Sequence, residues 1–280
     1  MEIDTFHKVL QKTGGYETPA NLPRNLCNRL FGNSSAWYYQ KIAKVVLSGC
    51  RIGNRGEFDN KQWARHSFMV ITALEECGGR IKISGCDEVS ACPGPKVFVS
   101  NHMSMAETFI FPSLLLYFGP LTTVVKESLV NYPIFGVIMR AVDPIIVGRK
   151  DPKSDLKEVM EKGEEMLHKG RSVLIFPQST RSTDFDVASF NSLGAKLAAR
   201  AGVPIVPVAL KTDYHGIGRV IRDCGPTDMS QTAYCRFGPP IKTEGNGREA
   251  QEKVVAFMME NLAQLGVRIA EENIQESEGK

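Results

Sequence analysis

Residues 97–111 read VFVSNHMSMAETFIF, and the change of pattern inside this stretch indicates the fold. An apolar run typical of a buried strand ends at Ser100, and a second apolar run of helical character follows Ser104. His102 lies in the short polar link between the two runs. In an α/β sheet, binding and catalytic groups gather in the loops that follow the carboxyl ends of strands. The stretch therefore predicts a strand, a loop that can carry chemistry, and a helix.

The same alternation continues along the chain. Short, β-branched apolar runs predict strands at residues 80–85, 96–100, 121–126, 143–148, 172–177, 204–210 and 233–238. Helical patterns lie between them, at residues 104–118, 152–169, 188–201 and 248–265. Near-continuous strands separated by helices predict an α/β fold with a mostly parallel sheet flanked by helices.

Two more helices are expected before this alternation, at residues 36–50 and 60–77, and a turn-rich link makes them a helical hairpin. Residues 1–35 are polar and punctuated by Gly and Pro, which predicts an irregular segment. The hairpin has a basic face that includes Lys41 and Lys44. Such a hairpin can lie in a lipid interface, or it can pack on the main domain.

The predicted organisation is an N-terminal segment with the amphipathic hairpin (1–77), an α/β domain (78–266) and an acidic tail (267–280). Net charge is +3, but residues 1–66 carry ten Lys and Arg against five Asp and Glu. This asymmetry indicates an anionic partner, although a solvated basic face would look the same. Nucleic acid is not expected, because no recognised reader motif accompanies the basic segment.

Neither secretion nor a membrane span is expected. The seven cysteines form no CxxC pair and their number is odd, which predicts reduced thiols in a cytosolic setting and no metal site. The first residues lack the order of a signal peptide. Residues 108–125 carry no charge, but Pro112, Gly119 and Pro120 interrupt them, so a core helix and a strand are expected there.

Glu107 follows His102 by five residues, a rotation of about 500° on an ideal helix. The two side chains can therefore meet only if His102 lies in the loop and Glu107 in the first helical turn. Ser104 and Glu107 also form the S-x-x-E pattern of a capping box. Glu107 is thus expected either to cap the helix alone, or to cap it with one oxygen and orient the imidazole with the other.

A second polar loop follows the strand at 172–177. It holds Gln178, Ser179, Thr180 and Arg181. Hydroxyls and a guanidinium at the carboxyl end of a strand can bind a phosphate or a carboxylate. An ordinary polar turn has the same composition.

Together these two stretches resemble the glycerolipid acyltransferase family, whose type is 1-acylglycerol-3-phosphate acyltransferase. The family's N-H-x4-D motif is matched by Asn101, His102 and, with Glu in place of Asp, Glu107. Its F-P-E-G-T-R-S motif is matched at residues 176–182, with Gln and Ser in place of Glu and Gly. Three further family segments have counterparts in VVKESL at 124–129, DPIIVGR at 143–149 and VPIVPV at 203–208. The resemblance covers about residues 80–240.

The resemblance implies acyl transfer from acyl-CoA or acyl carrier protein to the free hydroxyl of a lysophospholipid, most of all 1-acylglycerol 3-phosphate, without a cofactor or metal. His102 would be the general base, and Glu107 would orient it. Backbone N–H groups at the start of the helix at 104–118 would stabilise the oxyanion. Both substrates would suit a peripheral protein that lies on an anionic membrane surface, on the cytoplasmic side of the membrane.

The resemblance also implies an acceptor-phosphate site. Its residues would be Lys126, Arg149, Gln178, Ser179, Thr180 and Arg181, although Lys126 can equally be a surface lysine. Gln178 removes a negative charge beside the phosphate, so another lyso-lipid, such as a lyso-aminolipid, is an alternative acceptor. A catalytically inactive lipid-binding protein and a hydrolase that lets water attack are the rival classes. The absence of a G-x-S-x-G elbow argues against a serine hydrolase.

Overall fold

The computed structural model describes residues 1–178, 180–219 and 221–270. Every expected strand is present: β2 (Arg80–Ser84), β3 (Val97–Ser100), β4 (Leu121–Lys126), β5 (Ile145–Val147), β6 (Ser172–Ile175), β8 (Ile205–Lys211) and β9 (Thr232–Phe237). Three two-residue strands were not expected: β1 (Tyr16–Glu17), β7 (Phe185–Asp186) and β10 (Ile269–Ala270). Strands this short show no periodicity from which a sequence pattern could predict them.

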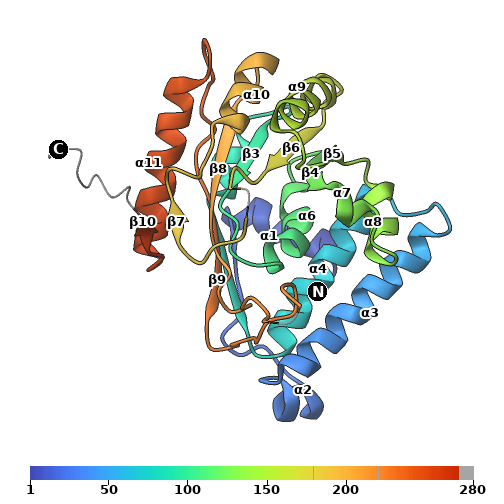
Figure 1. Ribbon diagram of the computed structural model, residues 1–280. Coiled ribbons are helices and arrows are strands. Elements are labelled where there is room, and N and C mark those ends of the chain that lie inside the picture. Colours follow the sequence, from blue (N-terminus) through green and yellow to red (C-terminus); the bar gives the residue numbers. More distant parts are fainter. Residues whose placement is uncertain (179, 220, 271–280) are drawn as a thin grey trace, which may run out of the picture.

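Within the described residues, the main sheet has eight strands in the order β1-β2-β9-β8-β3-β6-β4-β5 (Figure 1). The β1–β2 and β8–β9 pairs are antiparallel, whereas the other neighbours in this sheet run parallel. The predicted α/β fold with a mostly parallel sheet is therefore confirmed. The central strands β8, β3, β6 and β4 all point their carboxyl ends to one edge.

The expected helices are also present: α3 (Ser35–Gly53), α4 (Asn60–Glu76), α6 (Ala106–Leu115), α9 (Pro152–His168), α10 (Leu193–Ala201) and α11 (Arg248–Gln264). The helix α10 begins five residues later than predicted. Five helices were not expected: α1 (Ile3–Thr13), α2 (Leu26–Phe31), α5 (Cys86–Ser90), α7 (Glu127–Val130) and α8 (Phe135–Ala141).

The prediction that residues 1–35 are irregular is wrong. In α1, the buried side chains Ile3, Phe6 and Leu10 recur at three- and four-residue steps and form one apolar face. Asn25 caps α2 by accepting a hydrogen bond from the Asn28 amide at 2.8 Å. The Gly and Pro residues of this segment thus separate short elements from one another.

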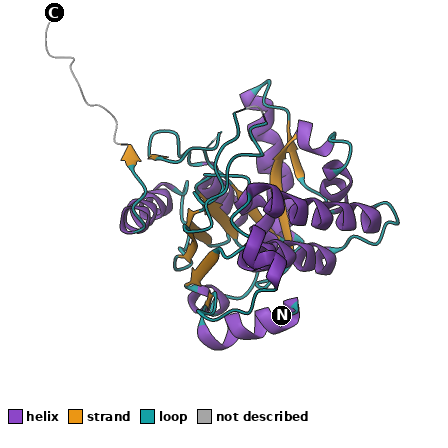
Figure 2. Ribbon diagram, turned by 90° about the horizontal axis from the view of Figure 1, so that it is seen from below, coloured by secondary structure: helices purple, strands orange, loops and turns teal. Residues whose placement is uncertain are grey.

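Apolar layers cover both faces of the sheet. Along β3, Phe98 belongs to one buried cluster, while Val97 and Val99 belong to the other, as the two-residue period of a strand requires. The first cluster is completed by side chains of α1, α3, α4 and α6, and the second by side chains of α9, α10 and α11. Helices accordingly lie on both sides of the strands in Figure 2.

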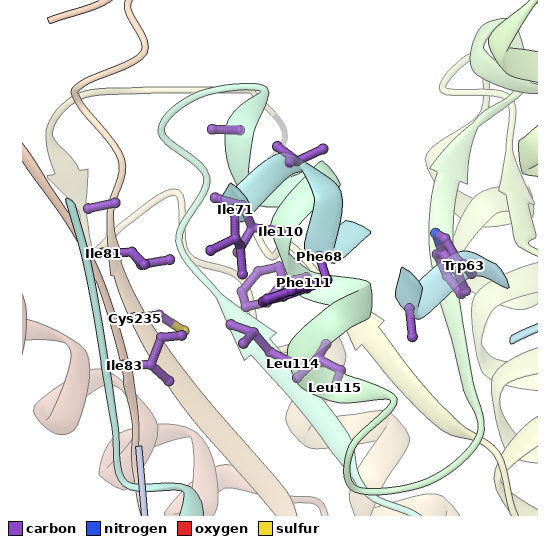
Figure 3. Packing of buried hydrophobic residues seen from close by; sticks show 14 of the residues in the cluster. Trp63, Phe68, Ile71, Ile81, Ile83, Ile110, Phe111, Leu114, Leu115 and Cys235 are labelled. Atoms are coloured by element: carbon purple, nitrogen blue, oxygen red, sulfur yellow. The ribbon is translucent and has the colours of Figure 1, made fainter. Parts of the chain in front are cut away.

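The predicted hairpin of α3 and α4 is confirmed, and it packs into the core. Phe68 and Ile71 of α4 lie against Ile110 and Phe111 of α6, on the side of the sheet where β2 places Ile81 (Figure 3). The apolar side of α3 is likewise buried. The hairpin therefore forms part of the same cluster as the strands. The domain division at residue 77 stays a prediction, and residues 271–280 of the acidic tail lie outside the described residues.

Residues 108–125, the uncharged stretch, form most of α6 and of β4, as expected. Among the residues that the structure describes, none of the helices combines the length and the apolar character that crossing a bilayer requires.

Candidate active site

Sheet order brings the predicted site residues to one edge. The strands β3, β6, β4 and β5 are parallel neighbours, so the loops after them lie side by side. His102 follows β3, the loop of Gln178 and Arg181 follows β6, Lys126 ends β4, and Arg149 follows β5. Ser179, which was also predicted for the site, lies outside the described residues.

The two residues of the predicted pair meet. The Nδ1 atom of His102 lies 2.9 Å from Oε1 of Glu107, with His102 in the loop and Glu107 in the first turn of α6. Since a carboxylate only accepts, Nδ1 carries the hydrogen and the neutral imidazole presents its lone pair at Nε2. The histidine side chain is 17% exposed and the glutamate side chain is 0% exposed. The pair is thus open to a substrate only on the imidazole side.

Hydrogen-bond donors surround the buried carboxylate of Glu107. Its Oε1 atom accepts from the backbone N–H groups of Met103 and Ser104, at 2.5 and 2.8 Å, in addition to the imidazole. Its Oε2 atom accepts from the hydroxyls of Ser104 and Thr212, both at 2.7 Å. These five donors compensate the loss of hydration that a buried charge suffers.

The same contacts determine the protonation of Glu107. Burial by itself raises the pKa of this carboxyl group. The hydrogen bond and the charge of His102, followed by the hydroxyls of Ser104 and Thr212, outweigh burial and bring the pKa below the ordinary value of 4.5. Glu107 is therefore ionised at neutral pH and can stabilise an imidazolium beside it.

Glu107 contacts the imidazole as predicted, but the capping box is formed only in part, because the N-cap of α6 is Met105 and its side chain makes no capping hydrogen bond. Oε1 accepts from the Ser104 amide, as in a capping box, and from the imidazole as well. Two of the amides predicted as oxyanion donors are engaged within the protein, those of Ser104 and Ala106, and an oxyanion role for the other amides at the start of α6 stays a prediction. The amides of Met103 and Ser104 donate to Glu107, and that of Ala106 donates to the Ser104 hydroxyl at 3.0 Å.

The loop after β6 fixes the imidazole from the other side. The ring of Phe176 stacks on the ring of His102, with centroids 4.4 Å apart and an angle of 26° between the planes. The Ser182 amide donates to the carbonyl of His102 at 2.9 Å, and the His102 amide lies 3.3 Å from Oε1 of Gln178. Gln178 is 3% exposed, and the contact described for its side chain is with the backbone of the histidine loop.

Asn101 joins the loop to the neighbouring strand β8. Its side-chain amide donates to the carbonyl of Leu210 at 2.8 Å, and its Oδ1 atom accepts from the Leu210 amide at 2.9 Å. This pair of bonds imitates a strand-to-strand ladder one residue beyond the end of β3. The asparagine of the N-H-x4-D motif thus fixes where the loop leaves the sheet.

The predicted phosphate-binding cations are more exposed than the histidine pair. Arg181 is partly buried, and its Nη2 atom forms an ion pair with the carboxylate of Asp223. Lys126 and Thr180 are exposed. The structure thus places a carboxylate beside Arg181 that the sequence pattern did not predict.

Arg149 follows β5 in a left-handed conformation with φ of 57°. Asp155 of α9 holds this turn, because its carboxylate accepts from the amides of Gly148 and Arg149 at 2.9 and 2.8 Å. A residue other than glycine adopts such a conformation only where surrounding contacts compensate the cost. The turn therefore projects the exposed Arg149 from the edge at which His102 lies.

Two residues of the site were missed. Thr212 lies two residues after the strand predicted at 204–210, as His102 lies two residues after the strand predicted at 96–100, so the same rule applies to it. Asp223 lies in a loop with no strand before it, and no sequence pattern connects it to Arg181. Its contact becomes visible only once the chain is folded.

Comparison with known proteins agrees with the geometry. The acyltransferase family model matches residues 80–211. A 1-acyl-sn-glycerol-3-phosphate acyltransferase of Pseudomonas aeruginosa is 30% identical over 237 residues, which cover 83% of this chain and 88% of that protein. The chain belongs to the glycerolipid acyltransferase family. It is therefore an O-acyltransferase, as the two motifs predicted.

Two further relatives of this acyltransferase are informative. A chloroplastic 1-acyl-sn-glycerol-3-phosphate acyltransferase of Arabidopsis thaliana is 32% identical over 51% of this chain and 38% of that protein. The crystal structure of a 1-acyl-sn-glycerophosphate acyltransferase from Thermotoga maritima matches with a TM-score of 0.60 and 19% identity, over 87% of this chain and 98% of that one. At that identity the similarity shows the fold alone.

Proposed function

We propose that this acyltransferase moves a fatty acyl group from an acyl thioester to the free hydroxyl of 1-acylglycerol 3-phosphate, which gives phosphatidic acid. The observation that supports it is the pair formed by His102 and Glu107, in which Nδ1 of the imidazole is engaged and the histidine side chain is 17% exposed. The printed names of the relatives support the acceptor. Acyl-CoA and acyl carrier protein are the two donor candidates.

His102 acts as the general base in this proposal. Its Nε2 atom takes the hydroxyl proton while the acceptor oxygen attacks the thioester carbonyl carbon. When the tetrahedral intermediate collapses, the carbon–sulfur bond breaks and the imidazolium returns the proton to the leaving thiolate. Glu107 keeps the imidazole in the Nδ1–H tautomer and stabilises the imidazolium. No cofactor and no acyl-enzyme enter this scheme.

The acceptor phosphate is bound by the cations at the same edge of the sheet. Arg181 presents five N–H donors, and its pairing with Asp223 engages Nη2, so its remaining donors suit a phosphate. Arg149 and Lys126 add positive charge from the loops after β5 and β4. Gln178 and Thr180 belong to the loop that carries Arg181, and Gln178 contacts the backbone amide of His102.

The test is acyl transfer from labelled acyl-CoA, and separately from acyl carrier protein, to 1-acylglycerol 3-phosphate, a lyso-aminolipid and water. Wild type is expected to acylate the phosphate-bearing acceptor, and His102→Ala is expected to lose roughly 10²–10⁴-fold in rate. The matched control is His168→Ala, which removes an exposed imidazole at the end of α9. Transfer to water alone would support the hydrolase, and equal rates for His102→Ala and wild type would reject the general base.

We also propose that α2 brings this site to an anionic membrane surface, as a peripheral contact on the cytoplasmic side. Leu26 and Leu30 lie one helical turn apart and are 70% and 68% exposed, next to the exposed Phe31. Arg24 and Arg29 flank them. Apolar side chains bordered by arginines suit a lipid interface. Figure 1 shows α2 at one end of the molecule, beyond the start of α3.

Binding to anionic vesicles tests this contact. A double variant, Leu26→Gln with Leu30→Gln, should weaken binding at low salt, and the matched control is Leu156→Gln, an exposed leucine on α9. Point variants are preferable to removal of residues 1–77, because α1, α3 and α4 fill the first buried cluster. Unchanged binding by the double variant would place the membrane contact elsewhere or exclude it.

A further inference from the structure

A buried hydroxyl outside the family motifs contacts the catalytic pair. Thr212 directly follows β8 and is 2% exposed. Its Oγ1 atom lies 2.7 Å from Oε2 of Glu107 and 3.0 Å from the Ser104 hydroxyl. Threonine has a hydroxyl where valine has a methyl group, and a buried hydroxyl costs free energy unless it is hydrogen-bonded, so packing alone would not require a hydroxyl at this position. The hydroxyl therefore serves the contact with the carboxylate.

We propose that Thr212 is a positioning residue of the acyl-transfer site, which holds the second oxygen of Glu107 and thereby fixes the plane in which Oε1 meets the His102 imidazole. The proposal rests on the proposed role of His102 as general base.

The need for such a residue follows from the chemistry of glutamate. The last torsion of a Glu side chain joins a tetrahedral to a planar carbon, and its rotational profile is broad. The direction of Oε1 is therefore set by what holds both oxygens. At Oε1 every described donor belongs to residues 102–104, the loop that also carries the imidazole. These contacts alone let carboxylate and loop shift together.

At Oε2 the two hydroxyls differ in origin. Ser104 belongs to the same loop, and its oxygen also accepts from the Ala106 amide, so it serves the start of α6 as well. Thr212 reaches Oε2 from the end of the neighbouring strand β8, which runs parallel to β3. It is thus the contact, among those described, that fixes the carboxylate relative to the sheet.

The residues that follow Thr212 along the chain are also held in place. The next residues contact α3, since the hydroxyls of Tyr214 and Tyr38 lie 3.2 Å apart and Nε2 of His215 lies 3.1 Å from the Tyr39 hydroxyl. The hydroxyl of Tyr39 donates to the carbonyl of Gly225 at 2.6 Å. These contacts leave Thr212 little freedom to follow a moving carboxylate, which is the property that a positioning residue needs.

The experiment compares Thr212→Val with Thr212→Ser in steady-state acyl transfer to 1-acylglycerol 3-phosphate. Loss of one hydrogen bond to a charged group predicts a fall in kcat of about 10- to 100-fold in Thr212→Val, with the acceptor KM unchanged. Thr212→Ser keeps the hydroxyl and should retain most of the activity. The matched control is Thr122→Val, because the buried Thr122 hydroxyl donates to the Asp143 carbonyl at 2.8 Å, away from the pair.

A pH profile separates positioning from mere packing. With one donor fewer, the Glu107 carboxylate retains a proton on the imidazole more strongly, so the fall in kcat/KM on acidification should begin at higher pH in Thr212→Val. A variant that only packs less well would keep the wild-type profile. If Thr212→Val does not fold, Thr212→Ala repeats the comparison with a smaller side chain.

The possible outcomes separate the role of Thr212 from the proposed function. A Thr212→Val enzyme with wild-type kcat, beside an inactive His102→Ala enzyme, would overturn the positioning role and leave the proposed function intact. An equal loss in Thr122→Val, or no rescue by Thr212→Ser, would also overturn it. Activity retained by His102→Ala would overturn the proposed function and this proposal with it.

Discussion

The histidine pair and the cations stand at the same edge of the sheet but are held in different ways. The Glu107 carboxylate is fully buried and receives five described hydrogen bonds, while the imidazole is stacked on Phe176. Lys126 ends β4 as an exposed side chain, and Arg181 is exposed in part and paired with Asp223. One half of the site is thus fixed by short-range contacts, and the other presents charge at the surface.

The difference suits the role that we propose for each half. Proton transfer needs heavy atoms within about 2.6–3.2 Å of each other, so a small displacement of the imidazole is costly. Attraction between a guanidinium and a phosphate falls off gradually with distance and tolerates side-chain motion. We therefore expect substitutions in the buried half to lower kcat, and substitutions in the exposed half to raise the acceptor KM.

Glu107→Gln removes the carboxylate from the buried half of the site and carries the largest expected effect. An amide can donate to Nδ1 and thereby favour the tautomer with hydrogen at Nε2, which cannot act as a base. We expect kcat to fall roughly 10²–10⁴-fold while the fold persists. The matched control is Glu75→Gln, because Glu75 is also buried and accepts from Tyr16 at 2.6 Å, but on another part of the molecule. A Glu107→Gln enzyme with more than a tenth of wild-type kcat would contradict this prediction.

Arg181→Ala addresses the exposed half. The loss of a charge-assisted hydrogen bond to the phosphate costs about 1.5–3 kcal/mol, which corresponds to about a 10- to 100-fold rise in acceptor KM. The value of kcat should change far less. Arg248→Ala, an exposed arginine on α11, is the control for a lost surface charge. A fall in kcat at constant KM would mean that Arg181 acts in the chemical step. The contrast between the buried and the exposed half would then be lost.

The sequence predicted the local parts of this site well. The strand before His102, the helix after it and the S-x-x-E pattern placed His102 and Glu107 within reach of one another, because six consecutive residues determine that geometry. The strands at 121–126, 143–148 and 172–177 were equally clear, and their carboxyl ends located the cations. Such features follow from periodicity and turn chemistry alone.

The contacts between residues of neighbouring strands could not be predicted from the sequence. Thr212 meets Glu107 only because β8 is the neighbour of β3, and strand order is not contained in any local pattern. For the same reason Asp223 could not be assigned to Arg181. The prediction for residues 1–35 was wrong for a different reason. The spacing of Ile3, Phe6 and Leu10 is a local helical pattern, and the Gly and Pro residues only separate the short elements.

The pH dependence of stability sharpens the comparison within the buried half. Because the pKa of Glu107 is lower in the folded chain than its ordinary value of 4.5, the unfolded state binds the proton more readily. Glu107 therefore stabilises the fold above that pH, and its contribution is lost as the pH falls through the lowered pKa. The difference in free energy of unfolding between wild type and Glu107→Gln, measured in urea, should shrink below about pH 4.5. A difference that grows on acidification would contradict the assigned charge state.

Lys126→Ala carries the smallest expected effect. An exposed ammonium in high dielectric contributes about 0–1 kcal/mol to an ion pair, so the acceptor KM should rise no more than about fivefold. Because screening weakens such contacts, the effect should decrease further as the ionic strength rises. Arg181→Ala measured over the same salt series provides the reference for a partly buried cation. If Lys126→Ala instead matches Arg181→Ala at high salt, Lys126 lies within the acceptor site when lipid is bound, and the exposed half is more ordered than the free protein indicates.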